Sequence, residues 1–287
     1  MSAELAGERP VDGDDPVLSL LAHHLRGRAG VSLERVLSVA QLTTRVELKY
    51  LVPLAALPAF LRGLPQELMA LDIGGRRIFD YESVYFDTEN FALYRNHVQG
   101  KRRRYKARIR SYCDSGDAML EVKLKGRRGQ TVKERLIYDF QRRQELTQEG
   151  RIFLDTVIAQ AYGFTAPPLW PSLTTAYRRA TLVDLERKSR LTIDVNLSWF
   201  DGESSRRADH LALIESKSLT GPGPADALLR SMGMRPVRIS KYCLGVALLH
   251  PDLAANPWNR LLTRQFDWQR RSSPELQIRS RHRARTP

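Results

Sequence analysis

The chain has 287 residues and a mass of 32.8 kDa, enough for one large domain or two small ones with a substantial core. Its 42% hydrophobic and 27% charged residues are typical of a globular protein and argue against a disordered or fibrous chain. Lysine and arginine outnumber aspartate and glutamate by 46 to 32, so the net charge is +14. An excess of this size predicts a polyanionic partner.

No window of the sequence approaches the ~18 consecutive apolar residues of a membrane-spanning helix. The N-terminal segment is acidic, unlike the basic and then apolar start of a secretory signal. Two cysteines, Cys113 and Cys243, are too few for a disulfide framework or a zinc finger. We therefore expect a protein without a transmembrane segment in a reducing, cytoplasmic location.

Charge and composition divide the chain into three expected parts. Residues 1–40 form a leader that is largely disordered, with a short helix over residues 17–25 that packs loosely. Residues 41–255 form one domain and keep most of the positive excess. Residues 256–287 form a basic, arginine-rich tail, in which eight arginines face two carboxylates from residue 260 onward.

Six short segments alternate between charged and apolar residues, which is the pattern of half-buried strands. In chain order they are residues 45–50, 104–110, 120–125, 131–136, 192–197 and 213–217. Helical spacing predicts helices over residues 52–68, 144–162, 224–232 and 240–249, with Ser240 as the N-cap of the last one. The glycines of residues 74–75 and 125–129 are typical of tight turns.

Four of the six alternating segments present mostly cations on their charged face. Like charges on neighbouring strands repel, so a sheet built from them is expected to hold a counter-anion. If the sheet closes into a barrel with helices on its outside, the charged faces line a basic channel that suits a linear polyanion. The alternative is an antiparallel sheet whose charged face meets water, which explains each strand taken singly.

Several motifs in the body resemble one known family. Tyr85-Phe-Asp-Thr88, followed by the basic segment 104–110, resembles the triphosphate tunnel metalloenzymes. Five further segments narrow the resemblance to the VTC domain, the polyphosphate-polymerase domain of the vacuolar transporter chaperone complex. They are Arg45-Val-Glu-Leu-Lys-Tyr50, Leu120-Glu-Val-Lys123, Tyr177-Arg-Arg179, Leu213-Ile-Glu-Ser-Lys217 and Ile239-Ser-Lys-Tyr242. The matches follow the family's order from about residue 43 to 248.

The resemblance implies an α+β fold, a closed antiparallel eight-stranded β-barrel with helices packed on its outside. It implies transfer of the γ-phosphate of ATP to a growing polyphosphate chain, with Mn²⁺ or Mg²⁺ as the cofactor. Carried over position by position, the implied catalytic residues are Arg108, Arg110, Lys123, Arg179 and Lys241. The implied substrate-binding residues are Lys49, Lys133 and Tyr177, and the implied metal ligand is Glu215.

The first strand departs from the wider superfamily, which has Glu-x-Glu-x-Lys where this chain has Arg45-Val-Glu47-Leu-Lys49. A cation thus replaces one acidic metal contact, which favours the VTC branch and leaves Glu47, Glu121 and Asp194 as candidate helpers of Glu215.

Some residues near these motifs have a purely structural role as the expected one, and two others have both a structural and a phosphate-binding role open. Tyr85 and Phe86 are expected in the strand core, and Asp87 as the cap of the following turn. Lys217 either neutralises Glu215 or contacts substrate. Arg190 either pairs with Asp194 or binds phosphate.

Two other functions fit the same residues. A metal-dependent tripolyphosphatase or nucleoside triphosphatase of the same fold would need a carboxylate to activate water, and the sequence places none. A non-catalytic module that binds polyphosphate or RNA would use the same basic faces. Base stacking on RNA is not favoured, because Tyr105 falls on the apolar side of its strand. The expected partners are therefore ATP and polyphosphate.

Overall fold

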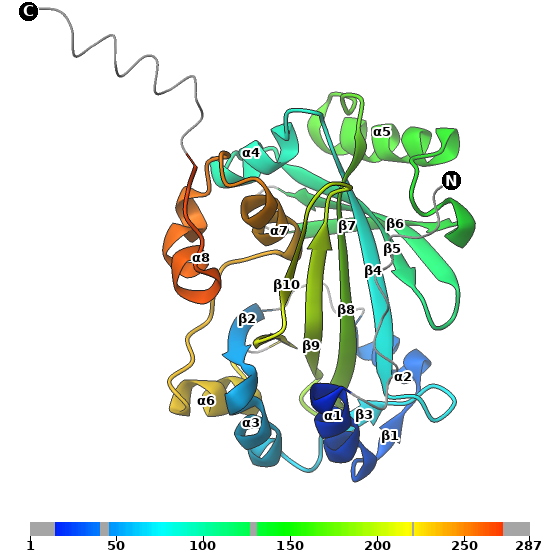
Figure 1. Cartoon of the computed structure of the whole chain (residues 1–287). Helices are drawn as coiled ribbons and strands as arrows, with labels where there is room; N and C mark the ends of the chain where they lie inside the picture. The colour runs from blue at the N-terminus through cyan, green and yellow to red at the C-terminus, as the bar shows by residue number, and fades with distance from the viewer. Residues whose placement is uncertain (1–14, 41–45, 127–130, 220, 272–287) are drawn as a thin grey trace, which may run out of the picture. The chain divides into compact units, whose positions relative to one another are not determined.

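The structure, a computed structural model, describes residues 15–40, 46–126, 131–219 and 221–271 (Figure 1). The strands are β1 (Gly30–Val31), β2 (Val46–Pro53), β3 (Met69–Leu71), β4 (Ile78–Asp87), β5 (Tyr105–Tyr112), β6 (Asp117–Lys125), β7 (Thr131–Tyr138), β8 (Trp170–Asp184), β9 (Ser189–Phe200), β10 (Ser205–Ala208) and β11 (Leu211–Ser218). The helices are α1 (Pro16–Arg26), α2 (Leu33–Ala40), α3 (Leu57–Gly63), α4 (Ala92–Val98), α5 (Gln148–Tyr162), α6 (Pro224–Ser231), α7 (Lys241–Leu249) and α8 (Asn259–Phe266).

Within the described residues, eight strands follow one another in the sheet order β2-β11-β9-β8-β4-β5-β6-β7. Three short strands lie off this path: β10 pairs with β9, β3 pairs with β8, and β1 pairs in parallel with β3. The registers of β2 with β11, β11 with β9, β5 with β6 and β6 with β7 are all antiparallel. The antiparallel α+β class is thus confirmed, and closure of the eight strands into a barrel stays a prediction.

The chain divides into two compact units, and the long strands β4, β8 and β9 contribute residues to both. Unit 1 draws on Met1–Tyr81, Tyr177–Leu197 and Ala208–Arg238, and unit 2 on Glu82–Ala176, Ser198–Arg207 and Ile239–Pro287. The sequence predicted one domain over residues 41–255 and did not reveal this division. Each unit is described on its own below.

In unit 1, helices α1, α3 and α6 bury their apolar faces against one side of the strands. Leu21 of α1, Phe60 of α3 and Leu229 of α6 are fully buried, together with Tyr50 and Ile214 from the strands. Burial of one such side chain contributes roughly 1.5–3 kcal/mol. The helix expected at residues 17–25 is therefore confirmed as α1, but it packs in the core and not loosely.

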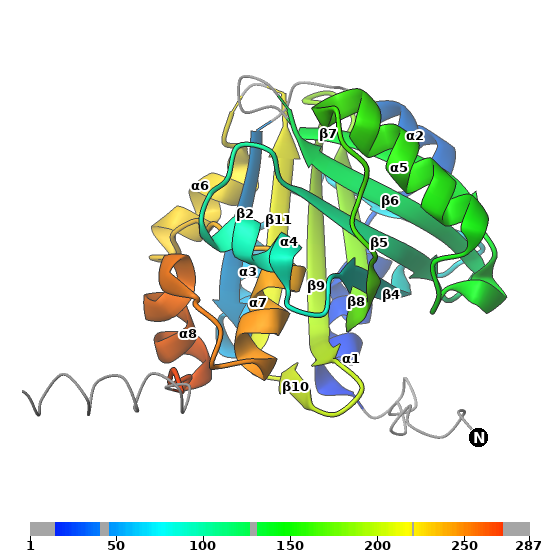
Figure 2. The same cartoon turned by 90° about the horizontal axis from the view of Figure 1, so that it is seen from above.

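In unit 2, α5 lies across β5, β6 and β7, as Figure 2 shows. Its residues Leu154 and Ile158 are fully buried against Leu120 and Ile109 of the sheet. The predicted helix 144–162 begins later, at Gln148, because the Thr147 hydroxyl accepts a hydrogen bond from Gly150 N and caps the helix there.

Three expectations are corrected. The helix predicted from residue 52 begins at Leu57, because Val52 and Pro53 continue β2 and pair with Ala212 and Leu211 of β11. Residues 256–268, assigned to the tail, are folded: α8 buries Leu262, and Trp268 Nε1 donates to Ala247 O at 2.7 Å. Residues 16–40 of the leader hold α1, β1 and α2, whereas the disorder expected before residue 15 lies outside the described residues.

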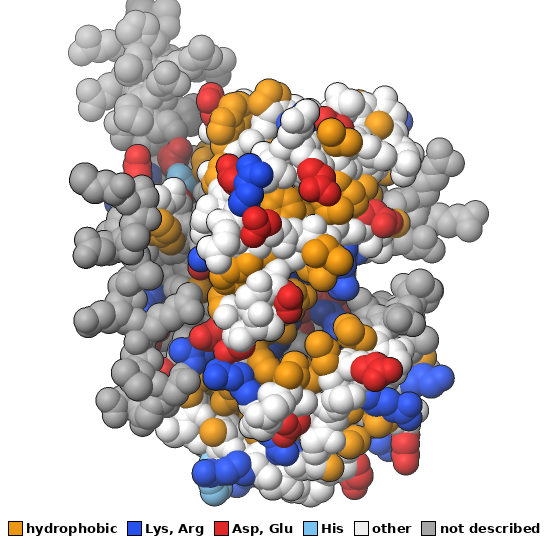
Figure 3. All heavy atoms as spheres, turned by 90° about the vertical axis from the view of Figure 1, so that its right-hand side faces the viewer, with side chains coloured by type: hydrophobic (Ala, Val, Ile, Leu, Met, Phe, Trp, Pro, Cys, Tyr) orange, Lys and Arg blue, Asp and Glu red, His pale blue; other side chains and the backbone are white. Residues whose placement is uncertain are grey.

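The turn predicted at Gly74-Gly75 is confirmed, since both glycines have positive φ angles, 59° and 83°, that favour glycine. Most of the predicted turn at 125–129, and Arg45, lie outside the described residues. None of the described helices is both long and apolar enough to cross a membrane. On the face drawn in Figure 3, basic and acidic side chains are interspersed among hydrophobic ones.

Candidate functional site

The face of β5, β6 and β7 opposite α5 carries rows of cations in unit 2. Strand register places Lys106 opposite Lys123 and Lys123 opposite Lys133, so three lysines lie side by side. In the next row, Arg108 and Arg135 flank Glu121. We call this set, with Arg104, Arg110 and Lys125, the basic face of unit 2. Like charges directly opposite on neighbouring strands destabilise a sheet, so the row of lysines is electrostatically unfavourable by itself.

Glu121 is the central counter-charge of the basic face and is only 2% exposed. Its Oε2 accepts hydrogen bonds from Arg108 Nε at 2.8 Å and Nη2 at 2.5 Å. Arg135 Nε lies 3.3 Å from Oε1, Arg110 Nε lies 4.0 Å from Oε2, and Lys133 Nζ also contacts Oε1. Glu121 therefore holds the arginines in place.

The pKa values at this cluster follow from burial and charge. Burial alone would raise the pKa of Glu121, but Arg108, Arg110 and Lys133 outweigh it and hold that pKa well below its usual range. Burial lowers the pKa of Lys133 to about 6, with Arg110 and Arg108 adding to the shift and Glu121 opposing it.

Tyr85 joins the basic face to the start of α7. Its hydroxyl accepts a hydrogen bond from Arg108 Nη1 at 2.9 Å, and its ring stacks on Tyr242 with centroids 4.9 Å apart. Burial would raise the pKa of Tyr85, but the charges of Arg108, Arg110 and Lys241 lower it. Lys106 Nζ donates to Ser240 Oγ at 3.0 Å, and that hydroxyl caps α7 through Cys243 N at 3.1 Å. Ser240 is thus confirmed as the N-cap of α7. The first residue of that helix, the buried Lys241, lies close enough to Tyr85 to affect its pKa.

Phe86 and Asp87 behave as the sequence predicted, and Tyr85 is buried in β4 as expected but faces the charged side. Phe86 lies in the core under α5, and the Asp87 carboxylate accepts from the backbone N–H groups of Thr88, Leu93 and Tyr94. Tyr85, expected in the strand core, is buried on the charged side, where it contacts Arg108. The alternation of β4 carried the signal for this difference, since neighbouring strand residues face opposite sides.

In unit 1, Glu215 lies between two lysines on the face of β2, β9 and β11 opposite the helices. Its Oε2 is 3.1 Å from Lys49 Nζ and 3.2 Å from Lys217 Nζ. Lys49 also pairs with Glu47, and Arg190 lies opposite Lys217 in the β11–β9 register. Burial lowers the pKa of Lys217 to about 8, although Glu215 and Glu47 oppose the shift. Of the two roles considered for Lys217, the contact with Glu215 is observed.

Arg179 is held by a bidentate ion pair with Asp194. Its Nε and Nη2 donate to the two carboxylate oxygens at 2.6 and 2.8 Å. The guanidinium also lies over the rings of Tyr81 and Tyr177, 4.9 and 5.1 Å from their centroids, and these rings stack on each other. Asp194 thus pairs with Arg179, and the pairing of Asp194 with Arg190 stays a prediction.

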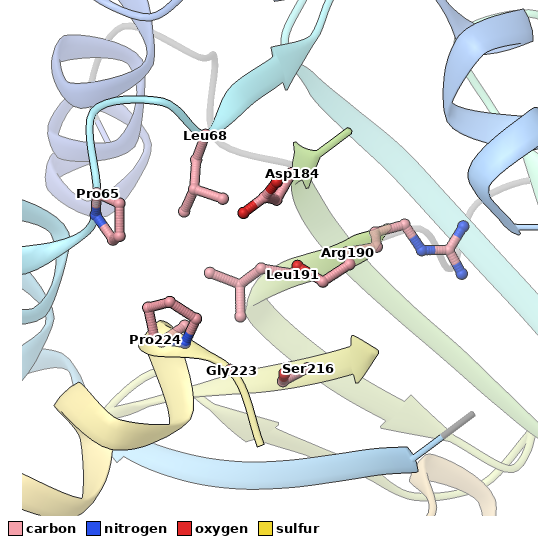
Figure 4. Close-up of a pocket in the computed structure, with 10 residues that line it drawn as sticks. Pro65, Leu68, Asp184, Arg190, Leu191, Ser216, Gly223 and Pro224 are labelled. Atoms are coloured by element: carbon pink, nitrogen blue, oxygen red, sulfur yellow. The ribbon is translucent and has the colours of Figure 1, made fainter. Parts of the chain in front are cut away.

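A small cavity in unit 1 is lined, among others, by Asp184, Arg190, Leu191 and Ser216. Its volume is about 20 Å³, room for roughly one water molecule. Figure 4 shows the Arg190 side chain extending away from the cavity. The cavity is too small for a nucleotide.

A comparison with protein families identifies the chain. Its residues 44–250, more than half of the sequence, match the VTC domain. The chain belongs to the VTC-domain family. The match includes every site residue expected from the sequence, from Lys49 to Lys241. Among curated proteins, none matches this VTC-domain chain.

Several solved structures are similar to this VTC-domain protein at low identity. An adenylate-cyclase-like protein from Vibrio parahaemolyticus is 15% identical, with a TM-score of 0.39 over 70% of this chain and 98% of that chain. A Hippeastrum adenylyl-cyclase-like protein, described as having a dominant triphosphatase activity, is 16% identical, with a TM-score of 0.41 over 70% and 94%. A Pyrococcus horikoshii protein is 15% identical, with a TM-score of 0.39 over 70% and 97%.

The nine residues that the VTC resemblance implied fall into two groups. Unit 2 brings together Arg108, Arg110, Lys123, Lys133 and Lys241. Unit 1 holds Lys49, Tyr177, Arg179 and Glu215 on the side of its strands opposite the helices. The sequence missed Tyr85 and Tyr81 as neighbours of the arginines. That the two groups line one channel stays a prediction.

Glu215 supplies a charged oxygen donor that a divalent ion could use, although its Oε2 also contacts Lys49 and Lys217. No group of three or more His, Cys, Asp or Glu side chains in the described ranges forms a metal cage. Opposite Glu215 in the register, however, the buried Thr192 hydroxyl has no hydrogen-bond partner. One or two carboxylates plus phosphate oxygens and waters are the usual ligands of Mg²⁺. Glu121, in contrast, is fully engaged by cations and is a poor candidate helper.

Proposed function

We propose that this VTC-domain protein is a polyphosphate polymerase that transfers the γ-phosphate of ATP to a growing polyphosphate chain. Membership of the family supports an enzyme that acts on triphosphates. The observation that carries the proposal is the basic face of unit 2, where Lys106 lies opposite Lys123 and Arg108 and Arg110 lie on the same side of β5. A partner with closely spaced negative charges is what would relieve this repulsion.

Phosphoryl transfer depends on positioning and on charge neutralisation more than on covalent chemistry. Arg108 and Arg110, two residues apart on β5, would grip neighbouring oxygens of one triphosphate, and Lys123, Lys133 and Lys241 would add point charges. In unit 1, Lys49, Tyr177 and Arg179 would contact phosphate. Arg179 would do so through Nη1, because its Nε and Nη2 donate to Asp194. A divalent ion at Glu215, Mn²⁺ or Mg²⁺, would neutralise phosphate oxygens.

A polymerase and a hydrolase of this kind differ in the nucleophile that attacks the γ-phosphate. The terminal phosphate of a polyphosphate chain is already an anion and needs no general base, whereas water needs one. The carboxylate on the basic face is that of Glu121. Three arginines and a lysine surround it and lower its pKa. A carboxylate with such a low pKa is a weak base, which favours transfer to phosphate over hydrolysis.

Product analysis tests the proposal. The purified protein is incubated with ATP and Mn²⁺ or Mg²⁺, and the products are separated by size. Long phosphate chains together with ADP support the polymerase. Orthophosphate without chains would instead establish the tripolyphosphatase or nucleoside triphosphatase, and tight binding without turnover would leave a polyphosphate- or RNA-binding module. A cytoplasmic location remains a prediction from the cysteine content.

Arginine variants test which side chains carry the turnover. We expect Arg108→Ala and Arg110→Ala each to lower kcat by about tenfold or more, which corresponds to roughly 1.4 kcal/mol of transition-state stabilisation. Arg76→Ala, at an exposed position of the β3–β4 turn, removes one arginine elsewhere and serves as the control. Near-wild-type kcat in both β5 variants would refute the proposed role of the basic face.

A further inference from the structure

An exposed basic loop extends the basic face beyond the sheet. Residues 101–104 read Lys-Arg-Arg-Arg and connect α4 to β5, as Figure 2 shows. Lys101, Arg102 and Arg103 are exposed, and Arg104 is half-buried. We call these four residues the basic loop. Arg104 is shared with the basic face, whereas Lys101, Arg102 and Arg103 have none of the roles given above for phosphate transfer.

The basic loop is anchored to the end of the β5–β6 hairpin. Arg104 O accepts a hydrogen bond from Lys125 N at 3.0 Å. The Tyr162 hydroxyl, from the end of α5, binds both strands: it donates to Arg104 O at 2.8 Å and accepts from Lys125 N at 3.0 Å. At the other end, Lys101 N donates to Asn96 O at 2.9 Å. The backbone that carries these cations is therefore held in place without a ligand.

Cations continue without a break from the basic face into the loop. Along β5, every second residue from Arg110 back to Arg104 is basic and faces the same side. The six steps from Arg104 to Arg110, at 3.2–3.4 Å per step, give a basic track of about 20 Å, which is longer than the phosphate tail of one nucleotide. A triphosphate can occupy only part of this track.

We propose that the basic loop binds the polyphosphate chain itself, at phosphates beyond the one that reacts. This inference rests on the proposed function and adds to it a site for the acceptor and product chain. Arginine forks recognise phosphate oxygens in pairs, and several exposed contacts together give an affinity that grows with chain length. The loop contains no aromatic side chain on which bases could stack, which favours polyphosphate over RNA.

A charge-matched pair of double variants tests the loop. Arg102→Ala/Arg103→Ala removes two exposed arginines from it. Arg206→Ala/Arg207→Ala removes two exposed arginines from β10, also in unit 2, and is the control. Binding of tripolyphosphate and of long-chain polyphosphate is measured by titration at several salt concentrations. The assay needs no turnover, so it decides the loop's role even if the protein makes no polyphosphate from ATP.

We expect the loop variant to lose about tenfold or more in affinity for the long chain and less than about twofold for tripolyphosphate. For the long chain, the slope of log affinity against log salt concentration should be smaller in magnitude by about two, one for each lost phosphate contact. The control should match the wild type in both. An equal loss in the control, an equal loss for tripolyphosphate, or tighter binding of single-stranded RNA than of polyphosphate would overturn the proposal.

Discussion

Replacement of Glu121 by glutamine tests whether the Glu121 carboxylate stabilises the basic face as its counter-charge, and whether bound phosphate can replace that charge. Removing one partner of a buried ion pair typically costs about 3–5 kcal/mol, because the remaining charge is left uncompensated. Arg108 and Arg110 have side chains that are 20% and 13% exposed, and Arg135 is 52% exposed, so water compensates part of their charge. We therefore expect Glu121→Gln to cost about 3 kcal/mol.

For a chain of this size, about 3 kcal/mol lowers the midpoint of thermal unfolding by roughly 6–12 °C. Glu134→Gln is the matched control, because Glu134 is exposed and lies opposite Val122, on the other face of β7 from the Glu121 cluster. A surface change of this kind shifts stability by about 0.5 kcal/mol or less.

Tripolyphosphate should then restore part of the loss. A ligand present at 1,000 times its Kd stabilises the folded state by about 4.1 kcal/mol, and each tenfold gain in affinity adds about 1.4 kcal/mol. Without Glu121, Arg108 loses the acceptor of two of its hydrogen bonds, so phosphate binds more tightly and the gap to the wild type narrows. The assay is thermal unfolding with and without tripolyphosphate. Equal midpoints for Glu121→Gln and Glu134→Gln, or a gap that the anion leaves unchanged, would refute the reasoning.

Three further outcomes are expected. Glu215→Gln keeps the fold and loses metal-dependent turnover, because it removes the charged oxygen donor; retained activity across an Mn²⁺ titration would move the metal role elsewhere. Lys133 has a pKa near 6 and takes up a proton when phosphate binds, so tripolyphosphate affinity falls as pH rises from about 6 to 8. Calorimetry in buffers of different ionisation enthalpy should detect that proton in the wild type but not in Lys133→Met. Gly245→Ala should cost about 1–3 kcal/mol, because its Cβ would clash with Trp199, whereas Gly27→Ala, with nothing within 4 Å, should be tolerated in urea unfolding.

The sequence by itself determined which side chains share a face within each strand. The period of two in residues 104–110 placed Arg108 and Arg110 on one side and Ala107 and Ile109 on the other, and the structure confirms it. Local chemistry also sufficed at Ser240, whose hydroxyl caps α7 as predicted. The order of the motifs along the chain was enough to point to the VTC family, to which residues 44–250 belong.

Only the tertiary structure decided which charges meet. Glu121 is surrounded by cations from β5 and β7 because the strand register, which depends on packing across the whole sheet, places these strands on either side of β6. For the same reason Asp194 on β9 pairs with Arg179 on the neighbouring strand β8. Residues 52–53 follow their partners in β11 into a strand despite a helical pattern, because pairing in the sheet outweighs local propensity.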